Sequence, residues 1–194
     1  MTNTSATGGY LSPGSGAPVE DDALEDLFCD VISGISGIAR VNVRPRWQAK
    51  PPPFPKDEVT WCAAGIMGST ADYSASSTHI GVGEGEEQVV RHDTVSVMAS
   101  FYGPHANSRA TLVRDGLSLS QNRDSLRAVG IAVRECTTMR TASDLLNERW
   151  VRRVDLDISL RRAITRVYPI LNLLSAQGEF RTSGGYVQNF VTET

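Results

Sequence analysis

The sequence holds two pairs of residues that general acid–base or metal chemistry could use. His92 is followed by Asp93, and Asp155 and Asp157 lie two positions apart in a strand-like segment. Neighbouring side chains of a strand point to opposite faces, so His92 and Asp93 are not placed to act as a base and its orienting partner. Asp155 and Asp157 share a face, but a metal ion would need further oxygen ligands that the sequence does not identify. The surrounding arginines are the simpler partners of these carboxylates.

A glycine-rich stretch and the other two histidines are no better candidates for a catalytic site than these pairs. The stretch Gly81 to Gly85 resembles a phosphate-binding loop in part, but it lacks the G-x-G-x-x-G spacing and is followed by glutamates that would repel a phosphate. His79 and His105 fall in predicted loops without clustered ligands, and no G-x-S-x-G motif occurs. The sequence therefore predicts no catalytic residue, no cofactor and no metal site, and it favours a protein that is not an enzyme.

Composition narrows the class of protein further. The chain has 194 residues, of which 40% are hydrophobic and 21% charged, which suits one globular domain with some additional sequence at its ends. Its three cysteines (Cys29, Cys62 and Cys136) are far apart and form no CxxC motif, so we expect reduced, buried thiols in a cytoplasmic protein. No apolar run approaches the roughly 20 residues of a membrane span, and no secretory signal pattern occurs at the N-terminus. We expect no membrane partner.

The most extended patterned segment runs from Arg149 to Pro169 and is rich in arginine. Apolar and polar residues alternate in its middle, which predicts a strand with one buried face, and its length would be on the order of 60 Å. The alternation changes near Arg161 and Arg162, which predicts a bulge or a strand that leaves its own core. A strand shared between subunits and a half-buried strand with solvated charges both fit this pattern.

Arginine also dominates the basic residues of the whole chain. Lys50 and Lys56 are the only lysines, so 17 of the 19 basic residues are arginine. Arginine suits bidentate pairing with carboxylates at protein contacts, although a GC-rich genome would produce the same bias. Because the formal net charge is −3, no overall positive field would attract nucleic acid.

The other elements predict a mixed architecture. Apolar residues from Leu24 to Ile35 recur at helical spacing after an acidic start, and a second helix is predicted from about Asn107 to Ser120. The order helix, strands, helix, strands predicts an α+β fold: a mostly antiparallel sheet with two main helices packed on one face. Other expected elements are strands at Val59–Met67, Val89–Tyr102 and Ile170–Arg181, a long exposed loop at Gly68–Glu87, a short helical turn at Ala142–Leu146, and an edge strand at Tyr186–Thr194. We divide the chain into a flexible N-terminal arm (1–18), an α+β domain (19–182) and a C-terminal tail or edge strand (183–194).

Several segments, in this order, resemble the phage neck terminator family, whose fold is related to that of tail terminators. They are TSATGGYLSP, EDDALEDLFCDVISGISG, RPRWQ with its proline-rich connector, TWCAAGI and RWVRRVDLDISLRRAITRVYPI. The resemblance extends from about Thr4 to Arg181, and Tyr186–Thr194 matches least. It implies a ring, commonly sixfold, that stops tail growth and joins the tail to the head, with no cofactor or reaction. The implied partners are other copies of the chain, the tail tube protein, the head connector or a neck protein, and genomic DNA in the lumen, in a virion assembled in the host cytoplasm.

Contacts between neighbours in a ring join two different surfaces, so arginines on one edge would face carboxylates on another. The candidate interface or lumen residues are Arg149, Arg152, Arg153, Arg161, Arg162 and Arg166. Their candidate partners are Glu20, Asp21, Asp22, Glu25 and Asp26.

Two other classes of function stay open. An unrecognised enzyme would need a pocket with convergent histidine or carboxylate groups. A nucleic-acid-binding or DNA-channel-lining module would need arginines clustered with aromatic residues, as Trp150 is among Arg149, Arg152 and Arg153.

Overall fold

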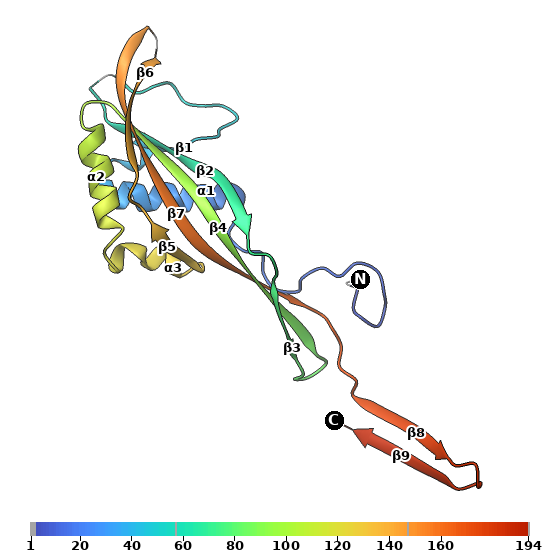
Figure 1. The fold of residues 1–194 in the computed structure, drawn as a ribbon. Helices are drawn as coiled ribbons and strands as arrows, with labels where there is room; N and C mark the ends of the chain where they lie inside the picture. Colours follow the sequence, from blue (N-terminus) through green and yellow to red (C-terminus); the bar gives the residue numbers. More distant parts are fainter. Residues whose placement is uncertain (1–2, 57, 147, 194) are drawn as a thin grey trace. The chain divides into compact units, whose positions relative to one another are not determined.

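The computed structural model of the protein describes residues 3–56, 58–146 and 148–193 (Figure 1). The helices are α1 (Asp21–Ser36), α2 (Ala106–Gly116) and α3 (Asp124–Arg127), with 3-10 turns η1 (Arg40–Asn42) and η2 (Gln121–Arg123). The strands are β1 (Val43–Pro45), β2 (Trp61–Ala71), β3 (Ser76–Ile80), β4 (Glu86–Tyr102), β5 (Ile131–Glu135), β6 (Met139–Leu146), β7 (Arg149–Tyr168), β8 (Ser175–Arg181) and β9 (Val187–Glu193).

The chain forms two compact units. The main unit comprises residues 17–74 and 91–164, and the small unit comprises the described residues of 1–16, 75–90 and 165–194. Strands β4 and β7 contribute residues to both units, whereas β8 and β9 belong to the small unit. The division of the chain at residues 18 and 182 stays a prediction.

A seven-stranded sheet forms the scaffold, in the order β1-β2-β4-β7-β5, with β3 also paired to β4 and β6 also paired to β7. Among the pairings with a described register, β1 with β2 is parallel and the others are antiparallel. Strands β8 and β9 form a separate two-stranded sheet. The predicted α+β class with a mostly antiparallel sheet is confirmed.

The core of the main unit lies between the helices and one face of the sheet, and Figure 1 shows α1 passing behind the strands. Apolar residues at helical spacing on α1, including Phe28 and Ile32, pack with Ala110 and Val113 of α2. The strands contribute alternate residues, as their sequence pattern predicts. On β4 these are Val95, Val97, Ala99 and Phe101, and on β7 they are Val154, Leu156, Ile158 and Leu160.

The region from Gly68 to Glu87 corrects the prediction of one long exposed loop. Strand β2 continues to Ala71, and β3 pairs with β4 from Ser76 opposite Val90 to Ile80 opposite Glu86. The polar sequence of β3 did not predict a strand. This strand is held to β4 by backbone hydrogen bonds and has no apolar face that a sequence pattern would reveal. The glycine-rich stretch that resembles a phosphate loop is the turn of this hairpin, where Gly83 and Gly85 have φ of 66° and 97°.

The segment from Ala142 to Leu146 also differs from its prediction. It is the end of β6 and not a helical turn, and its residues pair with β7 from Ala142 opposite Arg153 to Leu146 opposite Arg149. Alanine and leucine favour helix locally, but the long neighbouring strand offers backbone hydrogen bonds along its whole edge. Tertiary pairing therefore overrides local preference.

Two helical glycines should respond to alanine in opposite directions. A Cβ at Gly116 of α2 would overlap the Cγ2 of Ile35, whereas a Cβ at Gly34 of α1 meets no atom within 4 Å. We expect Gly34→Ala to stabilise the protein by about 0.5–1 kcal/mol through backbone entropy, and Gly116→Ala to destabilise it by about 1–3 kcal/mol through overpacking. Denaturant unfolding of both variants measures this, and equal stabilisation would show that α1 and α2 do not pack closely at Gly116.

Candidate interaction surfaces

The polar side of β7 carries a network of charged groups on the face opposite the core. The Asp155 carboxylate is 5% exposed and accepts hydrogen bonds from Ser100 Oγ at 2.5 Å and from Arg153 at 3.0 Å. Arg153 also donates to Asp144 of β6 at 2.7 Å, and this hydrogen bond to Asp144 raises the pKa of the guanidinium although burial opposes the shift. Arg46 donates to Ser100 Oγ at 2.5 Å. These contacts tie β4, β6 and β7 together, so Arg153 has a role within its own chain.

Arg161 extends the same face and pairs with Asp72, which follows β2. One guanidinium nitrogen donates to Asp72 Oδ1 at 2.7 Å and the other contacts Oδ2, a bidentate geometry. The hydrogen bonds from Arg161 lower the pKa of the Asp72 carboxyl below its ordinary value. Both side chains are partly exposed, at 35% and 45%.

Arg162 differs from its neighbour because it occupies the buried parity of the strand. Arg162 is 7% exposed, and Ile164 beyond it is buried as well, so the alternation of β7 continues through both arginines. The guanidinium donates to the Val19 carbonyl oxygen at 2.5 Å and lies 3.8 Å from Glu20. In the pairing of β7 with β5, the register shift lies between Val133 and Glu135 of β5 and not at Arg161 and Arg162.

The remaining candidates are placed as follows. Arg152 is exposed, Arg166 is half-buried in the small unit, and the side chain of Arg149 lies outside the described part of the structure. Of the acidic set, Asp21 and Asp22 are exposed, Glu25 is half-buried, and Asp26 pairs with Arg40 at 2.8 Å. The structure brings members of the two sets together at Glu20 and Arg162. Interface roles for these residues stay predictions.

An aromatic pocket in the main unit was not predicted from the sequence. The Trp61 ring stacks on Tyr102, with centroids 4.2 Å apart, and contacts Phe54 at 5.9 Å. Arg44 lies over the same ring, and prolines 51–53 line a cavity of about 420 Å³ beside it. Tryptophan and arginine are enriched where proteins bind each other. The signal was present as RPRWQ and PPPFP, but the sequence does not show that these segments meet Trp61.

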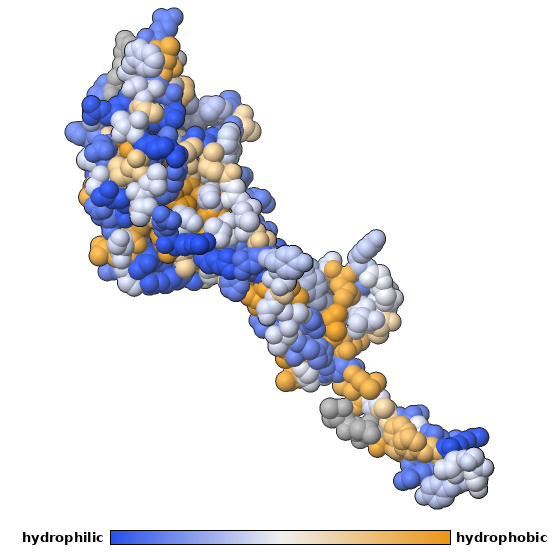
Figure 2. Space-filling view, in the orientation of Figure 1, coloured by the Kyte–Doolittle hydropathy of each residue, from blue (hydrophilic) through white to orange (hydrophobic). Residues whose placement is uncertain are grey.

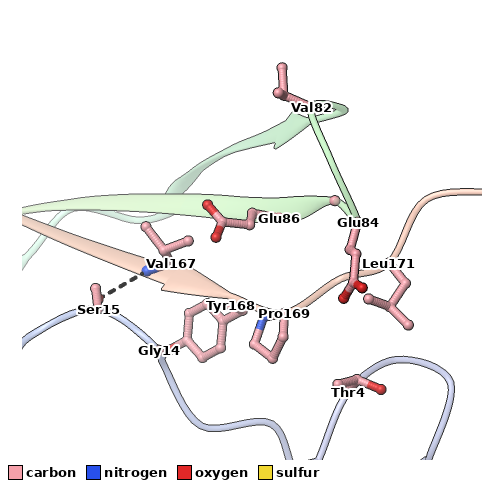
Figure 3. A pocket seen from close by; sticks show the side chains of 11 residues that line it. Thr4, Gly14, Ser15, Val82, Glu84, Glu86, Val167, Tyr168, Pro169 and Leu171 are labelled. Carbon is pink, nitrogen blue, oxygen red and sulfur yellow. Dashed lines mark hydrogen bonds between the residues drawn. The ribbon is translucent and has the colours of Figure 1, made fainter.

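The small unit holds a second cavity, of about 440 Å³, at the end of β7 (Figure 3). The N-terminal segment lies along this strand end: Gly14 N donates to the Val167 carbonyl at 2.8 Å, and Val167 N donates to Ser15 Oγ at 3.2 Å. Glu84 and Glu86 line the cavity from the β3–β4 hairpin (Figure 3). The cavity is acidic and open, and its lining suits contact with a basic group of another protein.

The three cysteines are free thiols. Cys29 and Cys62 are buried and free, as predicted, and Cys136 is half-buried. Burial raises the pKa of Cys29 to about 12 and that of Cys136 to about 11, so both thiols stay protonated near neutral pH. Within residues 3–56, 58–146 and 148–193, no group of three histidine, cysteine or acidic residues could hold a metal ion. In the same residues no helix is long and apolar enough to cross a membrane.

These features define a mixed α+β scaffold whose surfaces suit protein contacts. Residues 21–184 match the family model described as "Phage neck terminator protein", so the chain belongs to this family of structural proteins of the bacteriophage virion. Membership implies oligomeric assembly and interaction with tail and head proteins. No curated protein matches the chain.

The two adjacent arginines should differ in their effect on folding. Arg162→Ala removes a buried guanidinium and leaves the Val19 carbonyl without its donor, so we expect a loss of about 2–3 kcal/mol in the free energy of unfolding. Arg161→Ala is the matched control, and its partly exposed pair with Asp72 should contribute much less. Denaturant unfolding of both variants tests this. A larger loss for Arg161→Ala would mean that the burial of Arg162 is unimportant.

The Asp72 carboxyl should titrate below the usual range for aspartate. Because its pKa is lowered in the folded protein, its contribution to stability is present above the ordinary aspartate pKa and is lost as the pH falls through the lowered value. Arg161→Gln should raise the pKa of Asp72 toward its ordinary value, because Arg161 is the largest cause of the lowering. NMR titration of the carboxyl carbon measures both, and an unchanged Asp72 pKa in the variant would show that Arg161 is not its partner in solution.

Proposed function

We propose that the protein forms a ring, commonly sixfold, that ends the tail tube and joins the tail to the head connector. The observation that carries this proposal is the family match over residues 21–184. The ring would contact the tail tube protein on one face and the connector or a neck protein on the other. Its lumen would lie near genomic DNA without reading sequence, and the protein would assemble in the host cytoplasm and act without catalysis.

Charged residues along β7 support a role in contacts between subunits. Arg153 and Arg162 are held within their own chain by buried or partly buried acceptors. Arg152 is exposed on the same strand, and Trp150 beside it is 74% exposed. An exposed arginine next to an exposed tryptophan combines two of the three residue types that most often dominate binding energy at interfaces. We therefore place the strongest candidate contact of β7 at Trp150 and Arg152.

The acidic cavity of the small unit offers a complementary surface. Glu84 and Glu86 line it, and none of its lining residues is basic. A ring needs two different surfaces on each subunit, since each contact joins unlike patches. Arginine on one subunit and glutamate on the next would favour correct pairing and disfavour like surfaces.

Phage that lack the protein should accumulate heads and unattached tails, some of abnormal length, because neither tail growth nor joining is completed. Complementation with Arg152→Glu should restore few joined virions, since reversal places like charges at the subunit contact. Electron micrographs of the particles measure both effects.

Arg134→Glu is the control, because Arg134 is also an exposed arginine on a strand but lies on β5, outside the candidate set. It should restore joined virions in normal numbers, and the thermal unfolding of both variants should match that of the unaltered protein. Normal joining without the protein would refute the terminator function. If Arg152→Glu and Arg134→Glu restored joining equally, the proposed contact at Arg152 would be refuted, but the terminator function would not.

A further inference from the structure

The family match stops inside the C-terminal hairpin formed by β8 and β9. The family match ends at residue 184, in the turn between β8 and β9, so β9 lies outside it. The two strands nevertheless pair in a continuous register, from Ser175 opposite Glu193 to Arg181 opposite Val187, with no register shift. The hairpin is therefore a regular β element whose role must be argued from its own residues.

One face of this hairpin is aromatic and organised around a glycine. Phe180 and Phe190 lie with ring centroids 5.0 Å apart, and a Cβ at Gly178 would come within 2.5 Å of the Phe190 ring. The Phe190 ring therefore lies over the backbone of Gly178, in the space that a side chain at this position would occupy. An aromatic ring packed over a glycine in this way stabilises the glycine within a strand. Phe180 is 62% exposed and Phe190 is 38% exposed, so both side chains are partly open to solvent. Figure 2 shows hydrophobic residues on the surface of this hairpin.

A hairpin of this kind is not stable through its own contacts. Two-stranded sheets are marginal in water unless a third strand or another layer covers them. Tyr186 and Val191 are exposed at 64% and 67%, so the apolar surface of the hairpin exceeds what the Phe180–Phe190 contact covers. The hairpin needs a partner that supplies further strands or a covering layer.

The outer edges of the hairpin are suited to pair with other strands. Proteins that keep an edge strand single protect it with proline, lysine or a bulge. The segment from Ser175 to Glu193 contains neither proline nor lysine, and its register shows no bulge. Glu179 and Arg181 pair with each other at 2.9 Å, so their charges offset each other when identical hairpins lie side by side.

We propose that this hairpin pairs edge to edge with the same hairpin of neighbouring copies, so that the hairpins form a closed, continuous β-ring. Rotation about a ring axis leaves the direction of β8 along that axis the same in every copy, and β9 runs opposite to β8 in each copy. Pairing of β9 of one copy with β8 of the next is therefore antiparallel throughout. Each copy supplies one edge of each kind, so closure leaves none unpaired. This inference rests on the proposed ring and assigns the contact that closes it.

Amide exchange tests the proposal on the full-length protein, with native mass spectrometry to measure its oligomeric state. In a lone hairpin, alternate amides of β8 and β9 point away from the partner strand and exchange rapidly. In the β-ring they are hydrogen-bonded, so consecutive amides should be protected in the oligomer. A chain that stays monomeric at every concentration, or an oligomer whose alternate amides still exchange rapidly, would overturn the proposal. So would protection that requires added tail tube protein, because the partner would then be the tube.

Two glycine variants give a matched comparison. Gly178→Ala displaces the Phe190 ring, whereas Gly184→Ala in the turn has nothing closer than Thr182 Oγ1 at 3.9 Å. We expect Gly178→Ala to raise the concentration needed for assembly on the order of tenfold, and Gly184→Ala to leave it unchanged. A chain ended before Leu173 should remain folded and monomeric. If this shortened chain assembles as readily as the full-length protein, the hairpin does not close the ring. Such a result would leave the proposed terminator function standing, because that function is tested separately by the joining of heads to tails.

Discussion

The alternation of β7 between an apolar and a charged face is the constraint on which the rest of the structure depends. A slip of one residue would bring Arg153 and Asp155 into the core and expose Leu156. The network on the polar face opposes such a slip independently, because Asp155 is bound by Ser100 of β4 and Arg153 is bound by Asp144 of β6. Removal of one partner would leave a poorly solvated charge, so these contacts fix the register more than they add stability.

Elements with their own hydrophobic period were predictable from the sequence. The apolar stripe of α1 and the alternating apolar residues of β4 and β7 show in the sequence which face of each element is buried. These elements define the α+β class. Strands β3 and β6 were missed because their residues carry no such pattern. Thr78 and Ser143 are in strands because β4 and β7 lie beside them, and pairing through backbone hydrogen bonds needs no apolar pattern in the paired residues.

The candidate interaction residues show a similar limit. The sequence grouped Arg161 with Arg162, but their environments differ, because the acceptor of Arg162 is a backbone carbonyl 143 residues away. The stack of Phe54, Trp61 and Tyr102 likewise unites three separate segments. Residue type and spacing predicted that β7 is charged. Which of its arginines pair within the chain and which stay exposed depends on contacts between segments that are far apart in the sequence.

The two units differ in how completely they bury their apolar side chains. The main unit buries large side chains such as Phe101 and Leu156 between helices and sheet, so it can fold by its own contacts. In the small unit, Leu173 is 76% exposed and Tyr186 is 64% exposed, and β8 and β9 have no covering layer in the described residues. A chain of an assembling family can leave such surface open when other subunits cover it. The main unit thus has the packing to stabilise the subunit, whereas the small unit leaves apolar side chains exposed that another subunit could cover.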